Sequence, residues 1–153
     1  MVEVTIEHLE NGEWKPQTIK LDVDADMALT DETLDQEMCE LPRKIAQYAE
    51  VSAELHAMAA RKKNDVEVVE AEVAIDVRRK FAVSGDKITE PGIKEIVVVS
   101  PVVTAARNAF YHTDAEFRKV DGFYRSFREK ASLSIALCYK LKAEITAISS
   151  SLN

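Results

Sequence analysis

Three runs of basic residues, one of them interleaved with aromatic rings, are the parts of this sequence best suited to binding chemistry. They lie at 61–63, at 78–80 and within RKVDGFYRSFREK at 118–130. Basic side chains bind phosphates through counterion release, and exposed rings stack on bases. The runs therefore make a candidate surface for a single-stranded nucleic acid. Its candidate contacts are Arg61, Lys62, Lys63, Arg78, Arg79, Lys80, Arg118, Lys119, Arg125 and Arg128.

The third run combines the densest positive charge with aromatic residues. From 118 to 142 there are seven basic residues against two acidic ones, a net charge of +5. The rings of Phe117, Tyr124 and Phe127 also fall on the repeating apolar positions of a helix, where they would serve as core residues. Surface Lys and Arg residues are common on helices for solubility alone. The pattern indicates nucleic-acid binding but is also compatible with an ordinary solvated helix face.

Catalysis has no comparable pattern. The histidines, His8, His56 and His112, are far apart, and no HExxH, GxSxG, phosphate-loop or GxGxxG sequence occurs. Cys39 and Cys138 lie outside any CxxC or Cys/His spacing that would bind zinc. We therefore expect a protein that is not an enzyme and has no cofactor, no metal site and no disulfide framework.

The acidic stretch DVDAD at 22–26 is the one candidate for a calcium loop. Aspartates alternate along it, but the glycine and the twelfth-position glutamate of an EF-hand loop are missing. A solvated acidic linker is the better interpretation of this stretch.

The composition predicts a helical globular protein with unevenly distributed charge. Of 153 residues, 46% are hydrophobic and 31% are charged. No apolar run approaches the roughly 18 residues of a membrane span, and the acidic N-terminus is unlike a secretory signal. With cysteine usage that fits a reducing compartment, we expect a cytoplasmic protein without membrane association. The net charge of −7 divides into −10 for residues 1–40 and +3 for residues 41–153.

Two long amphipathic helices must position the basic runs. Apolar and small residues recur every seven positions over 41–73 and again over 103–148. The first repeat predicts a helix of about forty residues that ends near Phe81, preceded by a short helix that Pro42 interrupts. The second repeat predicts a helix of close to fifty residues that begins at Pro101.

The connection from 81 to 101 has the residues needed to reverse the chain. Ser84 and Gly85 are suited to ending a helix, and Thr89 is suited to capping the next segment. Residues 93–99 are compatible with a strand or a helix, and the cap favours a short helix. We therefore expect an antiparallel helical hairpin in which 61–63 lies near the level of 118–125.

Oligomerisation follows from the apolar residues outside the repeat. In an isolated helical hairpin Met58, Val77, Ile135 and Leu137 would stay exposed, which a soluble monomer avoids. We expect several copies to associate through the long helices.

The N-terminal residues predict a small β-structure. Apolar residues alternate over 2–6 and again over 19–23, and Asn11-Gly12 is the pair preferred in two-residue hairpin turns. The expected organisation is an acidic N-terminal β-hairpin and linker at 1–29, followed by a coiled-coil-like helical hairpin domain at 30–153. The fold class is mainly α.

The order of these features resembles a known family. A long helix rich in Val, Ala and Glu leads to VRRKFAVSG at 77–85, and GIKEIVVVSPVV at 92–103 leads into a second long helix. This pattern, over roughly 30–145, resembles the recombination mediator proteins of T4-like bacteriophages. The resemblance implies an oligomer that binds single-stranded DNA and helps to load a RecA-type recombinase in place of the single-strand binding protein.

The resemblance is one of pattern and assigns few residues. The family's basic residues before its Ser-Gly connection correspond to Arg79 with Arg78 or Lys80, whereas a family lysine two positions earlier falls on Val77 here. The N-terminal hairpin lies outside the resemblance. An oligomeric adaptor, as in virion assembly or scaffolding, would explain the long helices and acidic N-terminus equally well without nucleic-acid binding.

Overall fold

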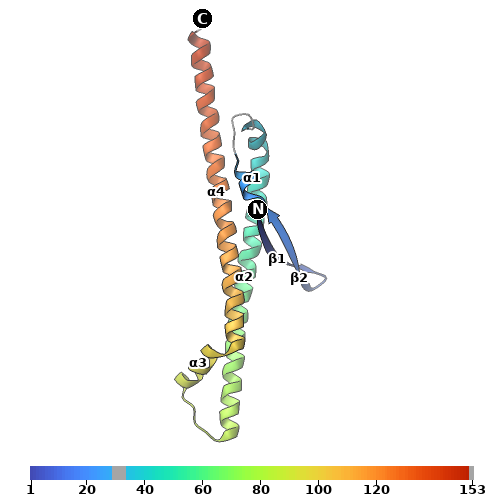
Figure 1. Ribbon diagram of the computed structural model, residues 1–153, viewed down its shortest axis with the longest axis vertical. Helices are drawn as coiled ribbons and strands as arrows, with labels where there is room; N and C mark the ends of the chain where they lie inside the picture. The colour runs from blue at the N-terminus through green and yellow to red at the C-terminus, as the bar shows by residue number, and fades with distance from the viewer. Residues whose placement is uncertain (29–33, 152–153) are drawn as a thin grey trace. The chain divides into compact units, whose positions relative to one another are not determined.

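The N-terminal residues form the predicted hairpin. In the computed structural model, which describes residues 1–28 and 34–151, β1 (Val2–Glu10) and β2 (Glu13–Leu21) pair antiparallel (Figure 1). Asn11 and Gly12 connect them with φ angles of 54° and 85°, the left-handed conformations that a type I′ turn requires. One face of the hairpin is buried, through Val4 and Leu21 among others. The predicted hairpin is confirmed.

The acidic stretch after the hairpin forms a short helix, in which Asp22 and Asp24 are exposed to solvent, as expected, whereas Asp26 is partly buried. Asp22 caps α1 (Val23–Met27) by accepting a hydrogen bond from the backbone N–H of Ala25. Asp26 accepts a hydrogen bond of 3.1 Å from the Tyr48 hydroxyl, 22 positions later in the chain, and lies 3.4 Å from the Lys44 ammonium. Local sequence does not reveal these distant partners. The predicted boundary between 29 and 30 lies outside the described residues.

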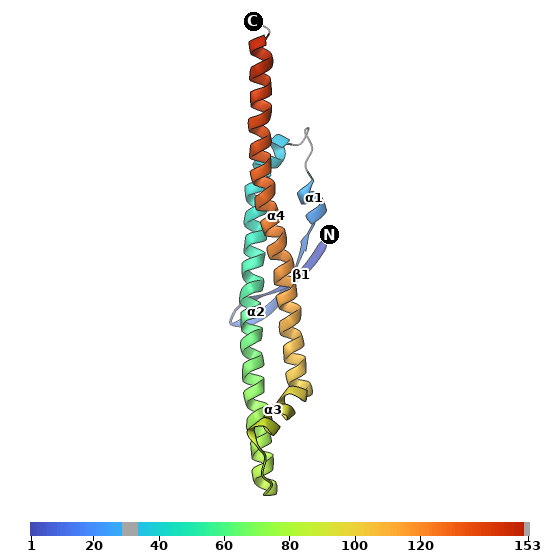
Figure 2. The same ribbon diagram turned by 90° about the vertical axis from the view of Figure 1, so that its left-hand side faces the viewer.

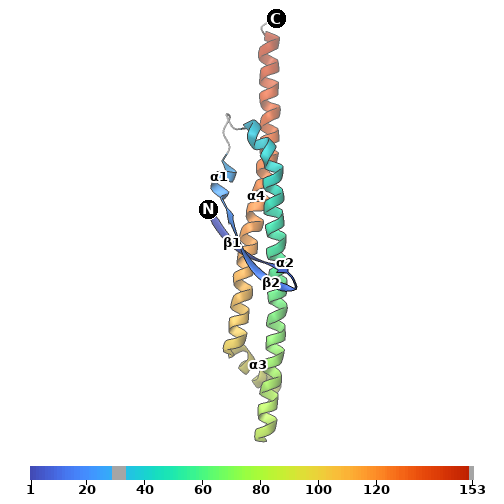
Figure 3. The ribbon, with the colours of Figure 1, turned by 90° about the vertical axis from the view of Figure 1, so that its right-hand side faces the viewer.

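Three further helices complete the mainly α fold that the sequence predicts. They are α2 (Leu34–Ser84), α3 (Glu90–Val99) and α4 (Pro101–Ser151), and the two long ones have 51 residues each. α2 is longer than predicted because it runs through Pro42, and Figure 3 shows that the helix changes direction near its N-terminal end. Proline removes one helical hydrogen bond and favours a bend. Burial of Leu41 and Lys44 beside it holds the helix together.

The chain divides into two compact units. The first unit comprises residues 1–52 and 119–153, and the second comprises residues 53–118. In the first unit α2 and α4 meet through Tyr48 and Phe127, whose ring centroids are 4.4 Å apart. In the second unit they meet through His56 and Phe117, with centroids 4.9 Å apart. The two long helices therefore pack against each other in each unit, as predicted.

In the second unit, α3 lies in the connection between the end of α2 and the start of α4 (Figure 2). The Thr89 hydroxyl caps it, accepting a 3.4 Å hydrogen bond from the backbone N–H of Gly92. Ile93, Val97 and Val103 form a buried cluster with Val77 of α2. The short connecting helix is confirmed over 93–99.

The expectation that off-repeat apolar residues stay exposed holds only in part. Val77 is buried because α3 covers it, and Met58 is buried as well. Ile135 remains exposed, and Leu137 is partly exposed. The case for association therefore depends on the C-terminal part of α4.

Two glycines give opposite expectations for substitution by alanine. Gly85 follows the end of α2 with a φ of 77°, so Gly85→Ala should lower the free energy of unfolding by about 1 kcal/mol. Gly122 lies inside α4, where an added Cβ would meet nothing within 4 Å, so Gly122→Ala should raise it by about 0.5–1 kcal/mol. Urea unfolding of the two variants checks both signs. A neutral or stabilising Gly85→Ala would contradict the helix end described here.

Candidate nucleic-acid interface

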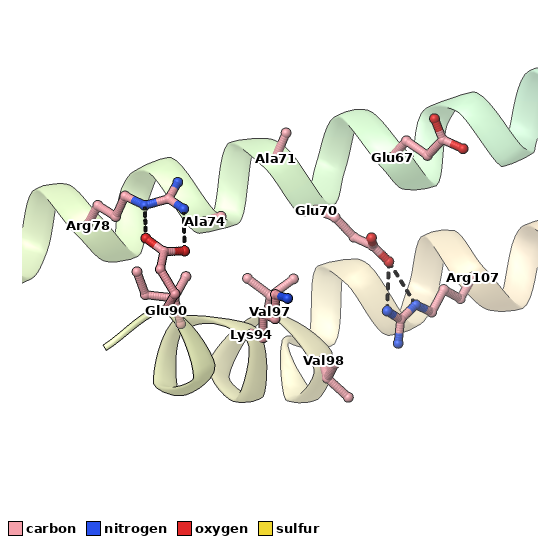
Figure 4. A pocket seen from close by; sticks show the side chains of 11 residues that line it. Glu67, Glu70, Ala71, Ala74, Arg78, Glu90, Lys94, Val97, Val98 and Arg107 are labelled. Carbon is pink, nitrogen blue, oxygen red and sulfur yellow. Dashed lines mark hydrogen bonds and ion pairs between the residues drawn. The ribbon is translucent and has the colours of Figure 1, made fainter. Parts of the chain in front are cut away.

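The basic run at 78–80 lies on the last turns of α2, and its first residue is tied to α3. Arg78 donates two hydrogen bonds to the Glu90 carboxylate, from Nε at 3.3 Å and from Nη2 at 2.8 Å (Figure 4). The hydrogen bond from Arg78 lowers the pKa of Glu90, so the pair stays charged at neutral pH. Because Glu90 is the first residue of α3, Arg78 also helps to fix this helix.

The next two residues of this run are exposed to solvent. Arg79 lies 3.3 Å from Asp76, one turn earlier on the same helix face, and both side chains are mostly exposed. Exposed ion pairs of this kind are weak and screened by salt, so a phosphate can replace the carboxylate. Lys80 is exposed, and within the part of the chain that the structure describes it makes no ion pair. Arg79 and Lys80 are therefore the residues of this run that a polyanion can reach without breaking the two hydrogen bonds between Arg78, which is also exposed, and Glu90.

A second arginine, which the sequence did not single out, connects α2 and α4. Arg107 donates hydrogen bonds of 3.0 Å and 2.7 Å from Nε and Nη2 to the Glu70 carboxylate. Together with the Arg78–Glu90 pair it borders a groove of about 480 Å³ floored by Ala74 and Val97 (Figure 4). No basic run surrounds Arg107, and its partner is 37 positions away, so no local signal marked it.

These contacts correct the predicted register of the first basic run. His56 lies against Phe117, and Glu70 lies against Arg107. Counting along both helices between these contacts places 61–63 level with about 112–114, one to three turns from the predicted 118–125. Lys63 is exposed on this run, whereas Arg61 and Lys62 are partly buried and engaged with other groups.

Two arginines of the third run are paired with acidic residues of their own helix. Arg118 lies 2.8 Å from Asp114, and Arg125 lies 2.7 Å from Asp121, both at i,i+4 spacing. Arg128 lies over the Tyr124 ring, 5.8 Å from its centroid. Arg118 belongs to the second unit, whereas Lys119, Arg125 and Arg128 belong to the first. The four side chains are exposed, and α4 supplies the counter-charges for two of them.

The aromatic rings of this run serve mainly as core residues. Phe127 is fully buried against Tyr48, and Phe117 is partly buried against His56. Phe123 and Tyr124 are also only partly exposed. The core interpretation is confirmed for Phe127, which leaves electrostatic contacts as the main means of binding a nucleic acid here.

Lys130, at the end of the same run, is buried and has a structural role. Its ammonium donates hydrogen bonds to the backbone carbonyls of Asp26 at 2.8 Å and Ala28 at 2.9 Å, and to the Glu37 carboxylate at 2.7 Å. The hydrogen bond from Lys130 lowers the pKa of Glu37 against the opposing effect of burial. Burial also opposes the charge of Lys44, but Glu37 and Asp26 outweigh it and raise the pKa of Lys44. We call these four residues, Asp26, Glu37, Lys44 and Lys130, the buried ionic cluster.

The C-terminal part of α4 exposes a continuous apolar stripe. Phe127 and Ser134 face α2 on this helix, and Leu141, Ile145 and Ile148 continue the same face where α4 extends past the first residues of α2 (Figures 1 and 2). All three are exposed, Ile145 by 67%. We call Leu141, Ile145 and Ile148 the terminal stripe.

No protein-family model, curated protein or solved structure matches the chain. Within residues 1–28 and 34–151, no three His, Cys, Asp or Glu side chains are grouped so as to hold a metal ion. None of the helices in these ranges is long and apolar enough to cross a bilayer.

Proposed function

We propose that this chain is a non-enzymatic recombination mediator of the cytoplasm. Copies associate through α4, bind single-stranded DNA and help to load a RecA-type recombinase in exchange for a single-strand binding protein. The observation that carries the proposal is the exposure of Arg79 and Lys80 beside the helix–glycine–short helix connection, where the family resemblance is concentrated.

The exposed terminal stripe supports the first part of this proposal, association through α4. An amphipathic helix whose apolar face is exposed is unfavourable in water, and copies of the same helix can bury that face by packing together. The stripe continues the seven-residue repeat, the pattern by which helices form multi-stranded bundles. A cyclic assembly would repeat each basic run once per subunit.

Repetition of weak sites explains how a protein of net charge −7 holds a polyanion. Only part of the candidate basic surface is accessible in one subunit, because Arg118 and Arg125 have neighbouring acids and Lys130 is buried. Each further subunit on one strand binds at a high effective concentration, so the assembly binds far more tightly than its parts. Counterion release makes that affinity strongly dependent on salt.

Arg79→Ala/Lys80→Ala is expected to weaken binding of a labelled oligo-dT and to reduce its dependence on salt. Two lost phosphate contacts per subunit reduce the slope of log affinity against log salt by about 1.4 per subunit engaged. Fluorescence anisotropy at several salt concentrations measures both quantities. Arg78 is kept, since its removal would release Glu90 and disturb α3.

Lys20→Ala/Arg43→Ala is the matched control, because it removes the same charge from exposed positions elsewhere. If the two variants lose affinity equally, the effect is one of net charge and the assigned contacts are wrong. If the wild-type oligomer fails to bind oligo-dT at low salt, the mediator proposal is wrong.

An oligomeric adaptor without nucleic-acid binding is the second candidate, and one observation favours it. Exposed apolar side chains occur in the terminal stripe and also around the start of α4, at Val99 and Val102. Several such surfaces on one chain are typical of an assembly subunit. A stable oligomer that ignores oligo-dT at low salt is the result that this alternative predicts.

A further inference from the structure

A hollow beside the basic run of α2 is bounded mainly by apolar side chains. It measures about 370 Å³ and lies in the second unit, between α2 and the junction of α3 with α4. Its apolar walls include Val73, Ile96 and Val99, and Val99 is 74% exposed. Lys80 and Asp76 also line it, and Asp76 is paired with Arg79. We call this hollow the corner groove; Lys80 is the one basic side chain among the described residues that line it.

The tip of the β-hairpin has the opposite character. Leu9 and Trp14 face each other across the strands, on the face opposite to buried Val4, and are 58% and 49% exposed. Trp14 is the one tryptophan of the chain. Glu13 precedes it, is exposed and, in the described parts of the chain, makes no ion pair. The tip therefore presents a large apolar pair beside an acidic side chain.

We infer that the hairpin tip of one copy docks in the corner groove of a second copy, with Trp14 against Val99 and Glu13 facing Lys80. The two surfaces are complementary: the tip offers an aromatic anchor to an apolar hollow, and the Glu13 carboxylate to the Lys80 ammonium, since Asp76 of the groove is paired with an arginine of α2. Burying a tryptophan removes roughly 150–250 Å² from water, and such residues dominate interface energies. The second copy is the occupant because one sequence carries both complementary surfaces.

The contact joins two different surfaces, so it runs head to tail around a ring or along a filament. It also covers Lys80. If Lys80 contacts DNA, the Glu13 carboxylate of the docked hairpin and the DNA phosphates compete for Lys80. Bound DNA then displaces the hairpin. This competition rests on the proposed function, whereas the docking itself does not.

Carbodiimide cross-linking of the full-length chain tests the docking. The reagent joins a carboxylate to an amine in direct contact, and equal parts of ¹⁴N- and ¹⁵N-labelled chains are mixed after subunit exchange. We expect a Glu13–Lys80 cross-link with mixed isotopes. Its absence, or its occurrence only within one label, would overturn the inference.

Val99→Asp should lower the yield of this cross-link about tenfold, the effect of losing one anchoring contact. Val83→Asp is the matched control, since Val83 is exposed in the same unit outside the lining of the groove. Quenching of Trp14 fluorescence by acrylamide gives a second measurement. Because docking shields Trp14, we expect quenching to be about twofold weaker in wild type and in Val83→Asp than in Val99→Asp. Equal quenching in all three chains contradicts the docking.

Added oligo-dT separates the docking from the proposed function. If the strand lowers the cross-link yield, docking and DNA share Lys80. If the cross-link forms and oligo-dT does not bind, the docking stands and the mediator function fails. If oligo-dT binds while no cross-link forms at any salt concentration, the docking is wrong and the mediator function stands.

Discussion

Lys130→Met is expected to destabilise the unit of residues 1–52 and 119–153 by about 3–5 kcal/mol, the effect of breaking a buried ion pair from one side. Lys130 is 5% exposed and donates to two carbonyls of the segment after the hairpin as well as to Glu37. Methionine fills the same space but donates nothing, so three acceptors lose their hydrogen bonds at once. The hairpin and α1 should detach from α2 and α4 first.

Urea unfolding followed by Trp14 fluorescence and by far-ultraviolet circular dichroism measures this loss. Lys140→Met is the matched control, because Lys140 is exposed on the same helix and should change stability little. Lys130→Met/Glu37→Leu should be less damaging than Lys130→Met alone, since it also removes the Glu37 oxygen that loses its donor, while Lys44 keeps Asp26 as a partner. A Lys130→Met chain within 1 kcal/mol of wild type would falsify the role given to the buried ionic cluster.

The same cluster makes stability depend on acid. The pKa of Glu37 is lower in the folded chain than in the unfolded chain, chiefly through its hydrogen bond from Lys130. The stabilising contribution of Glu37 is therefore complete at a pH above its pKa in the unfolded chain, about 4.3. It is lost as the pH falls through its lower pKa in the folded chain. In Lys130→Met, from which this hydrogen bond is missing, the loss of stability over that acid range should be smaller than in wild type.

Local sequence patterns predicted the elements but not the contacts between distant residues. The Asn11-Gly12 turn, the Thr89 cap and the helix end at Gly85 depend on a few neighbouring residues, and all three are confirmed. The path of α2 through Pro42 depends on burial of its neighbours, which propensity does not report. The same holds for Asp26, whose partners belong to α2.

The candidate site shows the same limit. Lys130 and Arg128 are two positions apart in one basic run, yet their side chains leave α4 in directions about 200° apart, one buried and one exposed. A count of basic residues in the sequence does not distinguish the buried lysine from the exposed arginine. The acids that offset Arg118 and Arg125 were visible in the sequence at i,i+4 spacing. The Arg78–Glu90 pair was not, because it depends on how α3 folds back.

Leu141→Asp/Ile145→Asp is expected to convert the proposed oligomer into a monomer of 17.1 kDa. Each aspartate would place a charge at the centre of the proposed helix contact, where desolvation without a partner costs several kcal/mol. Both residues are exposed in one subunit, so the fold of the monomer should survive. Sedimentation velocity gives the mass, and circular dichroism checks that the helices remain.

Ala143→Asp is the control for this variant. Ala143 is exposed within the same turns, and its side chain leaves the helix about 160° from Ile145, so its charge should leave the assembly intact. Equal dissociation by Ala143→Asp would mean that any added charge weakens the helix, and a wild-type chain that sediments as a monomer would contradict the terminal stripe as an interface.

The monomeric variant should also lose about 10²-fold or more in affinity for long oligo-dT, although every basic residue is intact. The loss follows from multivalency: a single subunit offers few accessible cations, whereas linked subunits engage one strand together. On an oligonucleotide too short for two subunits, wild type and variant should bind alike. A variant that binds long DNA as tightly as wild type would show that one subunit suffices, and the terminal stripe would then serve assembly independently of DNA.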